Sequence, residues 1–168
     1  MVAHIDEAET VALVDNYRHP IGRFSRELPS GGLEPDEAKA FEAASPEERQ
    51  YILKLAAIRE FREEVGRRLE LHQIRPLFPG PLQGSVGFAD QTYHIYHGEG
   101  GAMATQSLDD GEAGSLTHDR YSIGDAAEMI GHEIVDPATS TAVMALANVY
   151  GVRVQSLLDK ARARVIIA

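Results

Sequence analysis

The most informative stretch of the sequence is Arg59-Glu60-Phe61-Arg62-Glu63-Glu64-Val65-Gly66. On a helix, Glu60, Glu63 and Glu64 are spaced i, i+3 and i+4, which places three carboxylates on one face. Like charges this close repel one another and destabilise the helix. A divalent cation such as Mg²⁺ removes that penalty, because it binds carboxylate oxygens and shares its shell with substrate phosphates. Taken alone, the same pattern also fits a solvated acidic face on a surface helix.

The sequence around this stretch predicts one helix over residues 46–65. Ser45 and Glu48 form a capping box, and Pro46 suits the first helical position. Gly66 is typical of the residue that follows a helix. An apolar stripe includes Leu55, Ile58, Phe61 and Val65. The edge of the helix that carries Glu60 and Glu64 is therefore left to face a site.

A glycine-bearing turn lies upstream, Glu27-Leu28-Pro29-Ser30-Gly31-Gly32-Leu33-Glu34-Pro35-Asp36-Glu37. The turn and the acidic helix together resemble the Nudix box, G-x5-E-x7-R-E-U-x-E-E-x-G-U, in which U is a bulky apolar residue. Gly31 matches the first glycine, Glu37 matches the acid after the x5 spacer, and residues 59–66 supply the second half. The chain is therefore similar to Nudix hydrolases.

The resemblance has two departures. Residues 38–58 put 21 residues between Glu37 and Arg59 where the pattern has 7, and Arg67 stands at the final apolar position. The extra 14 residues divide into two inserts, 38–44 and 49–55. The second insert adds about two turns to the helix, so Ser45 still caps it. The box thus runs from 31 to 67, with its insertion within 38–55.

Further motifs resemble the ADP-ribose pyrophosphatase branch of that family. Residues 11–20, VALVDNYRHP, resemble the "LV-x-QYR-x-P" strand of the branch, and residues 27–31 resemble its "ELPAG". Residues 133–136 and 138–146 resemble its closing helix. Many members of the branch exchange strands in a dimer through an amino-terminal sheet extension. This sequence does not show that extension, so a homodimer remains open.

The resemblance also implies roles for individual residues. Glu60 and Glu64 would be the main ligands of Mg²⁺ or Mn²⁺, with Glu63 sharing the ion or holding a second one. The Ser30 carbonyl matches a position at which the family offers a backbone ligand. Arg59 would orient the glutamates through salt bridges without touching the substrate; the alternative is an exposed helix arginine.

Substrate contacts are expected from the strand and the turn. Arg18 would bind the diphosphate or the terminal ribose, since a guanidinium suits phosphate through its bidentate fork. The alternative is a solvated arginine on an edge strand. Gly31 and Gly32 would let the backbone approach phosphate or metal closely, or would simply form a tight turn.

The acid that positions the attacking water is expected on the long loop after the box. Glu112 fits that setting best, and Glu99 and Asp110 are alternatives. Glu37 either packs near the metal cluster or is a solvated loop acid, because the insert separates it from Arg59. The seven histidines show no metal-ligand spacing, and His94 and His97 are interpreted as structural or exposed.

Length and composition are consistent with this interpretation. A chain of 168 residues is expected to form a single domain. A net charge of −10 argues against broad binding to nucleic acid or an anionic membrane. The chain has no cysteine, no membrane-spanning run and no signal peptide at its beginning, which predicts a cytoplasmic protein.

The expected fold is α/β, a Nudix-type α/β/α sandwich with a mixed sheet. Strands are predicted over residues 2–5, 11–17, 73–78, 91–97 and 120–123, and helices over 46–65, from Ser122 or Asp125 to about 130, 136–150 and 152–168. Residues 98–119 are predicted to form a long loop.

The predicted function is metal-dependent hydrolysis of a small nucleoside diphosphate derivative, ADP-ribose to AMP and ribose 5-phosphate. The alternative is a Nudix-fold module that senses ADP-ribose or a nucleotide sugar without cleaving it. The presence of Glu60, Glu63 and Glu64 favours the enzyme. The sequence does not define the group attached to the diphosphate, because base and sugar contacts come from scattered side chains.

Overall fold

The central strand is β2 (Thr10–Arg18), whose residues Val11 to Val14 are all buried. Val11 and Leu13 belong to one hydrophobic cluster, and Ala12 and Val14 belong to another. Successive side chains of a strand point to opposite faces, so both faces of β2 are covered. This is why its sequence is a continuous apolar run rather than an alternating one.

A six-stranded mixed sheet is built around β2. The computed structural model describes residues 1–85, 89–108 and 117–151. The sheet order is β10 (Thr117–Ser122), β2, β1 (Val2–Ile5), β8 (Tyr96–Glu99) and β5 (Ile74–Pro76), and β3 (Arg23–Glu27) also pairs with β2. Strands β1 and β8 are parallel, and the other pairs are antiparallel. Two small sheets join β4 (Arg67–Arg68) to β9 (Ala102–Met103) and β6 (Leu82–Ser85) to β7 (Ala89–Tyr93).

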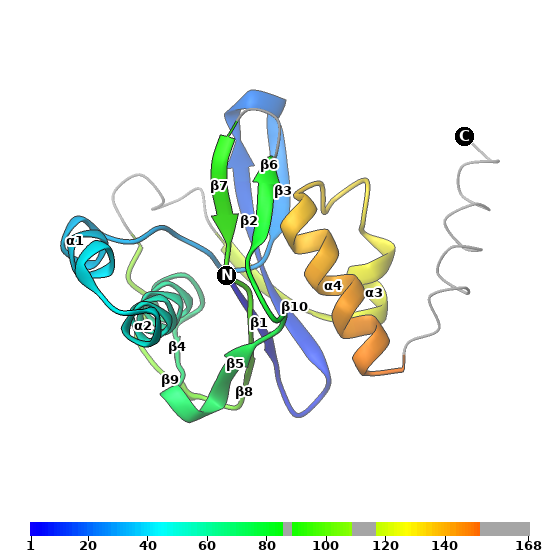
Figure 1. Ribbon diagram of the computed structural model, residues 1–168. Helices are drawn as coiled ribbons and strands as arrows, with labels where there is room; N and C mark the ends of the chain where they lie inside the picture. The colour runs from blue at the N-terminus through cyan, green and yellow to red at the C-terminus, as the bar shows by residue number, and fades with distance from the viewer. Residues whose placement is uncertain (86–88, 109–116, 152–168) are drawn as a thin grey trace, which may run out of the picture.

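Helices cover both faces of the sheet, as Figure 1 shows. Helix α2 (Pro46–Val65) packs on one face, where Phe61 and Val65 join the cluster that contains Ala12 and Val14. Helices α3 (Ile123–Glu128) and α4 (Pro137–Val149) pack on the other face. The predicted α/β/α sandwich with a mixed sheet is confirmed.

The predicted helix over 46–65 is also confirmed. Ser45 caps it: the Ser45 amide donates to Glu48 at 2.8 Å, and the Glu48 amide donates to the Ser45 hydroxyl at 3.4 Å. The helix ends at Gly66, which adopts the left-handed conformation with φ of 67°. Residues 49–55, interpreted from the sequence as the second insert, lie inside the helix.

Helix α1 (Pro35–Ala43) was not predicted. It begins with a local capping box, in which the carboxylates of Glu34 and Glu37 each accept a hydrogen bond from the backbone amide of the other residue. Pro35 occupies its first turn, a position at which proline costs no hydrogen bond. Residues 38–43, within the segment interpreted as the first insert, are therefore helical.

Several observed strand boundaries differ from the predicted ones. The two small sheets include segments whose sequences lack a strong strand pattern. The predicted strand over 91–97 is wrong as one unit, since β7 and β8 belong to different sheets. The predicted loop over 98–119 is wrong at both ends: β8 runs to Glu99, β9 pairs with β4, and β10 begins at Thr117. Strand β5 begins one residue later than predicted because Gln73 belongs to a 3-10 helix, Leu71–Gln73, and it ends at Pro76 rather than at residue 78. The predicted helix over 152–168 lies outside the described residues.

Candidate active site

A cleft of about 520 Å³ opens beside α2, the turn after β3 and strand β7. It combines charged and apolar side chains. Its lining includes Arg18, Glu27, Ser30, Gly31, Gly32, Leu33, Phe41, Leu53, Glu60, Tyr93, His94 and Asp136. Residues from the glycine turn and from the acidic helix therefore meet in one place, as their sequence motifs predict.

Two glutamates of α2 converge on the turn at Ser30 and Gly31. The Glu64 side chain is buried, and its Oε2 accepts a hydrogen bond of 2.8 Å from the Ser30 amide. The Glu60 carboxylate lies so close to Gly31 that a Cβ there would come within 2.1–2.2 Å of its atoms. A larger residue at position 31 would displace the Glu60 carboxylate from the turn, so glycine allows this close approach.

Arg59 holds the acidic cluster together. Its Nη1 donates to Glu60 at 2.7 Å and to Glu63 at 3.1 Å. Its Nη2 donates to Glu37 at 3.0 Å and to the Gly32 carbonyl at 3.1 Å. The structure thus places Arg59 where it can orient glutamates, and it brings Glu37 to the cluster through Arg59 although 21 residues separate the two in sequence.

This cluster carries an excess of negative charge. Arg59 lies within 4 Å of four carboxylates, those of Glu34, Glu37, Glu60 and Glu63. Arg62 also pairs with Glu63, at 3.3 Å, so two positive charges face four negative ones. Burial acts to lower the pKa of Arg59, but its bonds to Glu37 and Glu60 outweigh burial and raise it. Burial likewise acts to raise the pKa of Glu37, but bonds from Arg59 and the Glu34 amide hold it below its usual range. Arg59 and Glu37 are therefore both charged at neutral pH.

Arg18 contributes a positive charge to the cleft that the negatively charged Glu60 also lines. Its Nε donates to Glu27 at 2.8 Å, and the two side chains form an ion pair. The hydrogen bond to Glu27 is the main reason why the pKa of Arg18 is raised. The Glu27 side chain is 4% exposed and the Arg18 side chain 47% exposed, so the guanidinium is anchored at one end and open to solvent at the other.

Metal binding can be tested against these side chains. Among the described residues, no three or more His, Asp or Glu side chains are grouped so that they could hold a metal ion. Mg²⁺ does not require such a group, because it usually keeps several waters and binds one or two carboxylates together with substrate phosphates. Glu60 and Glu64, which converge on the Ser30–Gly31 turn, meet that smaller requirement.

Of the three acids considered for positioning the attacking water, the structure describes only Glu99. Glu112 and Asp110 lie outside the described residues. Glu99 lines a separate pocket with Arg75 and His97, and it pairs with Arg75 at 3.2 Å. His97 is buried with its ring 3.2 Å from the Tyr150 hydroxyl, which fits the structural role expected for it.

Seven of these lining residues were not identified as site residues from the sequence: Glu27, Leu33, Phe41, Leu53, Tyr93, His94 and Asp136. Glu27 belongs to the "ELPAG"-like motif, which could have indicated it. Asp136 caps α4 by accepting a hydrogen bond from the Thr139 amide. In the sequence it is therefore interpreted as a helix cap, and its position at the cleft is not predicted. Phe41 and Tyr93 carry no sequence signal, because only the fold brings α1 and β7 to the cleft.

Comparisons with known proteins support the fold. No family model matches the chain, and no curated protein matches it in sequence. Among solved structures, the chain is similar to one described as the crystal structure of an ADP compounds hydrolase. The TM-score is 0.65 and the sequence identity 15%, over 88% of this chain and 70% of that chain. This similarity shows a shared Nudix-like fold.

The helices of the described residues include none that combines the length and apolar character needed to cross a membrane.

Proposed function

We propose that this protein is a metal-dependent hydrolase that cleaves the diphosphate of a nucleoside diphosphate linked to another group, with ADP-ribose giving AMP and ribose 5-phosphate. The observation that supports this most is the convergence of Glu60 and Glu64 on the Ser30–Gly31 turn, beside a cleft that Glu60 and Arg18 both line. An acidic cluster and a half-exposed guanidinium at one cleft suit a metal-bound, anionic substrate. The Nudix-like fold is consistent with the proposal.

Mg²⁺ or Mn²⁺ is the proposed cofactor, held by Glu60 and Glu64, with Glu63 and the Ser30 carbonyl as additional ligands. When bound, the ion would neutralise charge on the diphosphate and make a water more nucleophilic. The negative charge around Arg59 attracts such an ion, while the arginine keeps the glutamates in place when the ion is absent.

The remaining roles follow from the chemistry of the substrate. Arg18 would bind phosphate oxygens through its solvent-exposed edge, with Glu27 fixing the guanidinium from behind. The Gly31 and Gly32 backbone would approach the diphosphate closely. Water would attack one phosphorus, the bridging P–O bond would break, and a carboxylate, proposed to be Glu112, would accept the proton from water.

The decisive experiment is product analysis after incubation with ADP-ribose and Mg²⁺. Formation of AMP and ribose 5-phosphate, absent when the metal is chelated, is the expected result. Sugar nucleotides, dinucleoside polyphosphates and nucleoside triphosphates tested in parallel would identify the preferred linked group. Tight binding of ADP-ribose without products would overturn the hydrolase and favour a sensor.

A further inference from the structure

The two inserted segments meet at the cleft. Phe41 comes from the first insert, residues 38–44, and Leu53 comes from the second, residues 49–55. Both side chains line the cleft together with Leu33, which precedes α1. The inserts therefore add an apolar wall to a cleft whose other side chains include Arg18 and Glu60.

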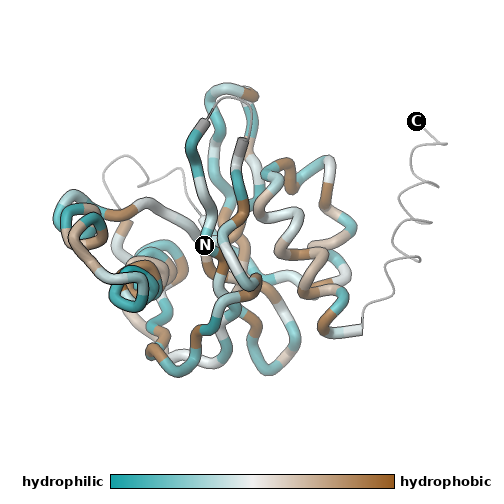
Figure 2. Tube along the Cα trace, in the orientation of Figure 1, coloured by the Kyte–Doolittle hydropathy of each residue, from teal (hydrophilic) through white to brown (hydrophobic). Residues whose placement is uncertain are grey.

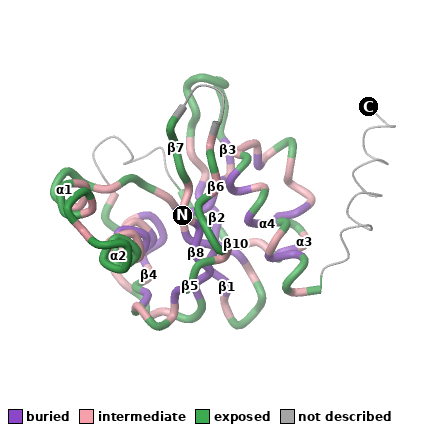
Figure 3. Tube along the Cα trace, viewed as in Figure 1, coloured by how far each residue is buried: buried purple, intermediate pink, exposed green. Residues whose placement is uncertain are grey.

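Core packing does not explain helix α1. None of its residues is buried, and it is largely hydrophilic along its length (Figures 2 and 3). It is nevertheless attached at both ends to α2. At its beginning, Glu37 pairs with Arg59 at 3.0 Å. At its end, Arg49 donates from Nε to the Phe41 carbonyl at 3.0 Å and from Nη2 to the Glu42 carbonyl at 3.2 Å.

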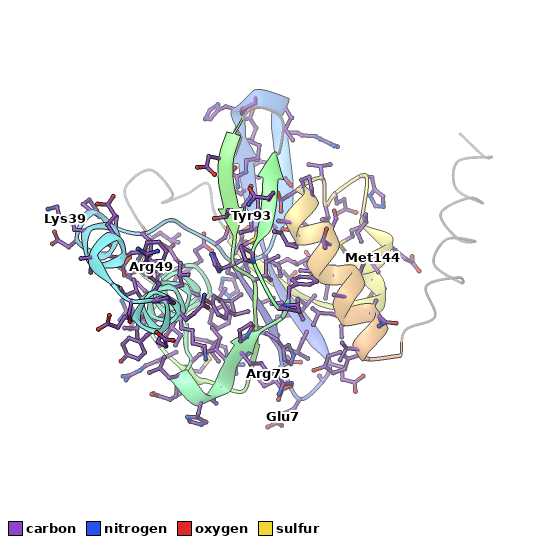
Figure 4. The ribbon with its side chains drawn as sticks, in the orientation of Figure 1. Glu7, Lys39, Arg49, Arg75, Tyr93 and Met144 are labelled. Atoms are coloured by element: carbon purple, nitrogen blue, oxygen red, sulfur yellow. The ribbon has the colours of Figure 1, made fainter. Side chains whose placement is uncertain are left out.

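These attachments fix the position of Phe41. The Arg49 guanidinium lies over its ring, 5.2 Å from the ring centre, in the region where Figure 4 labels Arg49 beside α1 and α2. Phe41 is only partly buried, so its ring is held in place without being enclosed. A partly exposed aromatic ring that is held at a cleft wall can bind a planar ligand at small entropic cost.

We propose that Leu33, Phe41 and Leu53 form the subsite for the nucleobase of the substrate, with the base stacked on Phe41. The proposal rests on the proposed function, because it assumes that the diphosphate lies toward Glu60 and Arg18. A base is flat, with a large apolar face, so it requires an apolar and preferably aromatic surface. These three side chains offer such a surface next to the acidic cluster.

The sequence contains no tryptophan, which allows a direct test. Phe41→Trp introduces the sole indole of the protein at the proposed stacking position. AMP contains no diphosphate bond, so it can be titrated with Mg²⁺ present and without turnover. We expect AMP to quench or shift the emission of Phe41→Trp in a saturable manner, and ribose 5-phosphate, which lacks the base, to leave it unchanged.

The matched control is Tyr51→Trp on the exposed surface of the second insert, where the side chain does not line the cleft. Its emission should not respond to AMP. An unchanged emission of Phe41→Trp at millimolar AMP, or an equal response to ribose 5-phosphate, would overturn the subsite. This readout does not depend on catalysis, so a saturable response without any hydrolysis would retain the subsite and reject the hydrolase.

A second variant tests the subsite if Phe41→Trp does not fold. Phe41→Ala should raise KM for ADP-ribose about tenfold, since stacking of one base contributes on that scale. It should leave unchanged the KM for 5-phosphoribosyl diphosphate, a diphosphate without a base. Equal changes for the two substrates, or none for ADP-ribose, would mean that Phe41 only packs the α1–α2 corner.

Discussion

Two arginine-centred networks have similar exposure but differ in charge balance: one has an excess of negative charge and the other is balanced. At the cleft, Arg59 is 20% exposed and contacts four carboxylates. On the edge strand β10, Arg120 is 25% exposed and pairs with one carboxylate, that of Asp6, at 2.7 Å. Its other contacts are neutral: Arg120 donates to the Thr10 carbonyl at 3.0 Å and lies 3.2 Å from Nδ1 of His4.

His4 completes the second network as an uncharged ring. Its Nε2 lies 2.6 Å from the Gly100 carbonyl, which can only accept, so Nε2 carries the proton. Nδ1 is then free of a proton and accepts from Arg120. The ring is buried and lies 4.9 Å from the ring of Phe61. Each charge and each ring nitrogen in this network has a partner.

The comparison of the two networks indicates that Arg120 serves the stability of the fold and that Arg59 serves the function of the cleft. Around Arg120, charges pair one to one, as expected where only a stable fold is required. Around Arg59, four carboxylates face two arginines, Arg59 and Arg62, and this excess of negative charge is unfavourable because like charges repel. The imbalance has a physical rationale if the cleft receives a cation.

The largest expected effect comes from Glu64→Gln. The amide retains the shape of the side chain and its bond from Ser30 but loses the negative charge, so kcat should fall on the order of 10²–10³-fold. Circular dichroism and Tm should change little. Glu47→Gln, on an exposed residue of the same helix, is the control and should hydrolyse normally. Near-normal turnover of Glu64→Gln at saturating Mg²⁺ would refute its role as a metal ligand.

Arg18 is an intermediate case, since it pairs one to one like Arg120 but lies at the cleft. Arg18→Ala should raise KM roughly 10- to 100-fold, because a charged hydrogen bond contributes about 1.5–3 kcal/mol. It should also lower Tm, since Glu27 is left buried and unpaired. Adding Glu27→Gln should restore Tm but not KM. Recovery of both would show that Arg18 only neutralises Glu27.

Exchanging arginine for lysine in both networks tests the contrast directly. A lysine cannot reproduce the planar fork, so Arg59→Lys should lower kcat about 10- to 100-fold, the usual scale for residues that orient metal ligands. Arg120→Lys should lower Tm and leave kcat and KM unchanged. The contrast fails if both variants lose only stability or both lose only activity.

The smallest expected effect is a pH dependence of stability from His4. Burial is the main reason why the pKa of His4 falls from 6.5 to about 4. A neutral ring is therefore favoured in the folded state, and its contribution is complete above pH 6.5 and lost as pH falls toward 4. At pH 5 the loss should be roughly 2 kcal/mol. Urea unfolding at pH 7 and pH 5 should show a shallower decline for His4→Gln, and parallel declines would contradict the assignment.

Local sequence signals predicted a large part of this molecule. The start of α2 at Ser45 and its end at Gly66 follow from caps that involve residues at most a few positions apart. The acidic face of α2 follows from helical periodicity, and the core strands β1 and β2 follow from their apolar runs. These features depend on interactions between residues that are close in sequence, so they can be predicted from the sequence alone.

Only the tertiary structure decided how distant segments meet. The sequence does not require the Ser30 amide to reach Glu64, because that contact depends on the packing of α2 against the sheet. The recruitment of Phe41 to the cleft likewise depends on Arg49 and Arg59, which attach a helix that has no buried residue of its own. Sequence therefore determined which residues can perform chemistry, whereas long-range packing determined which of them share a cleft.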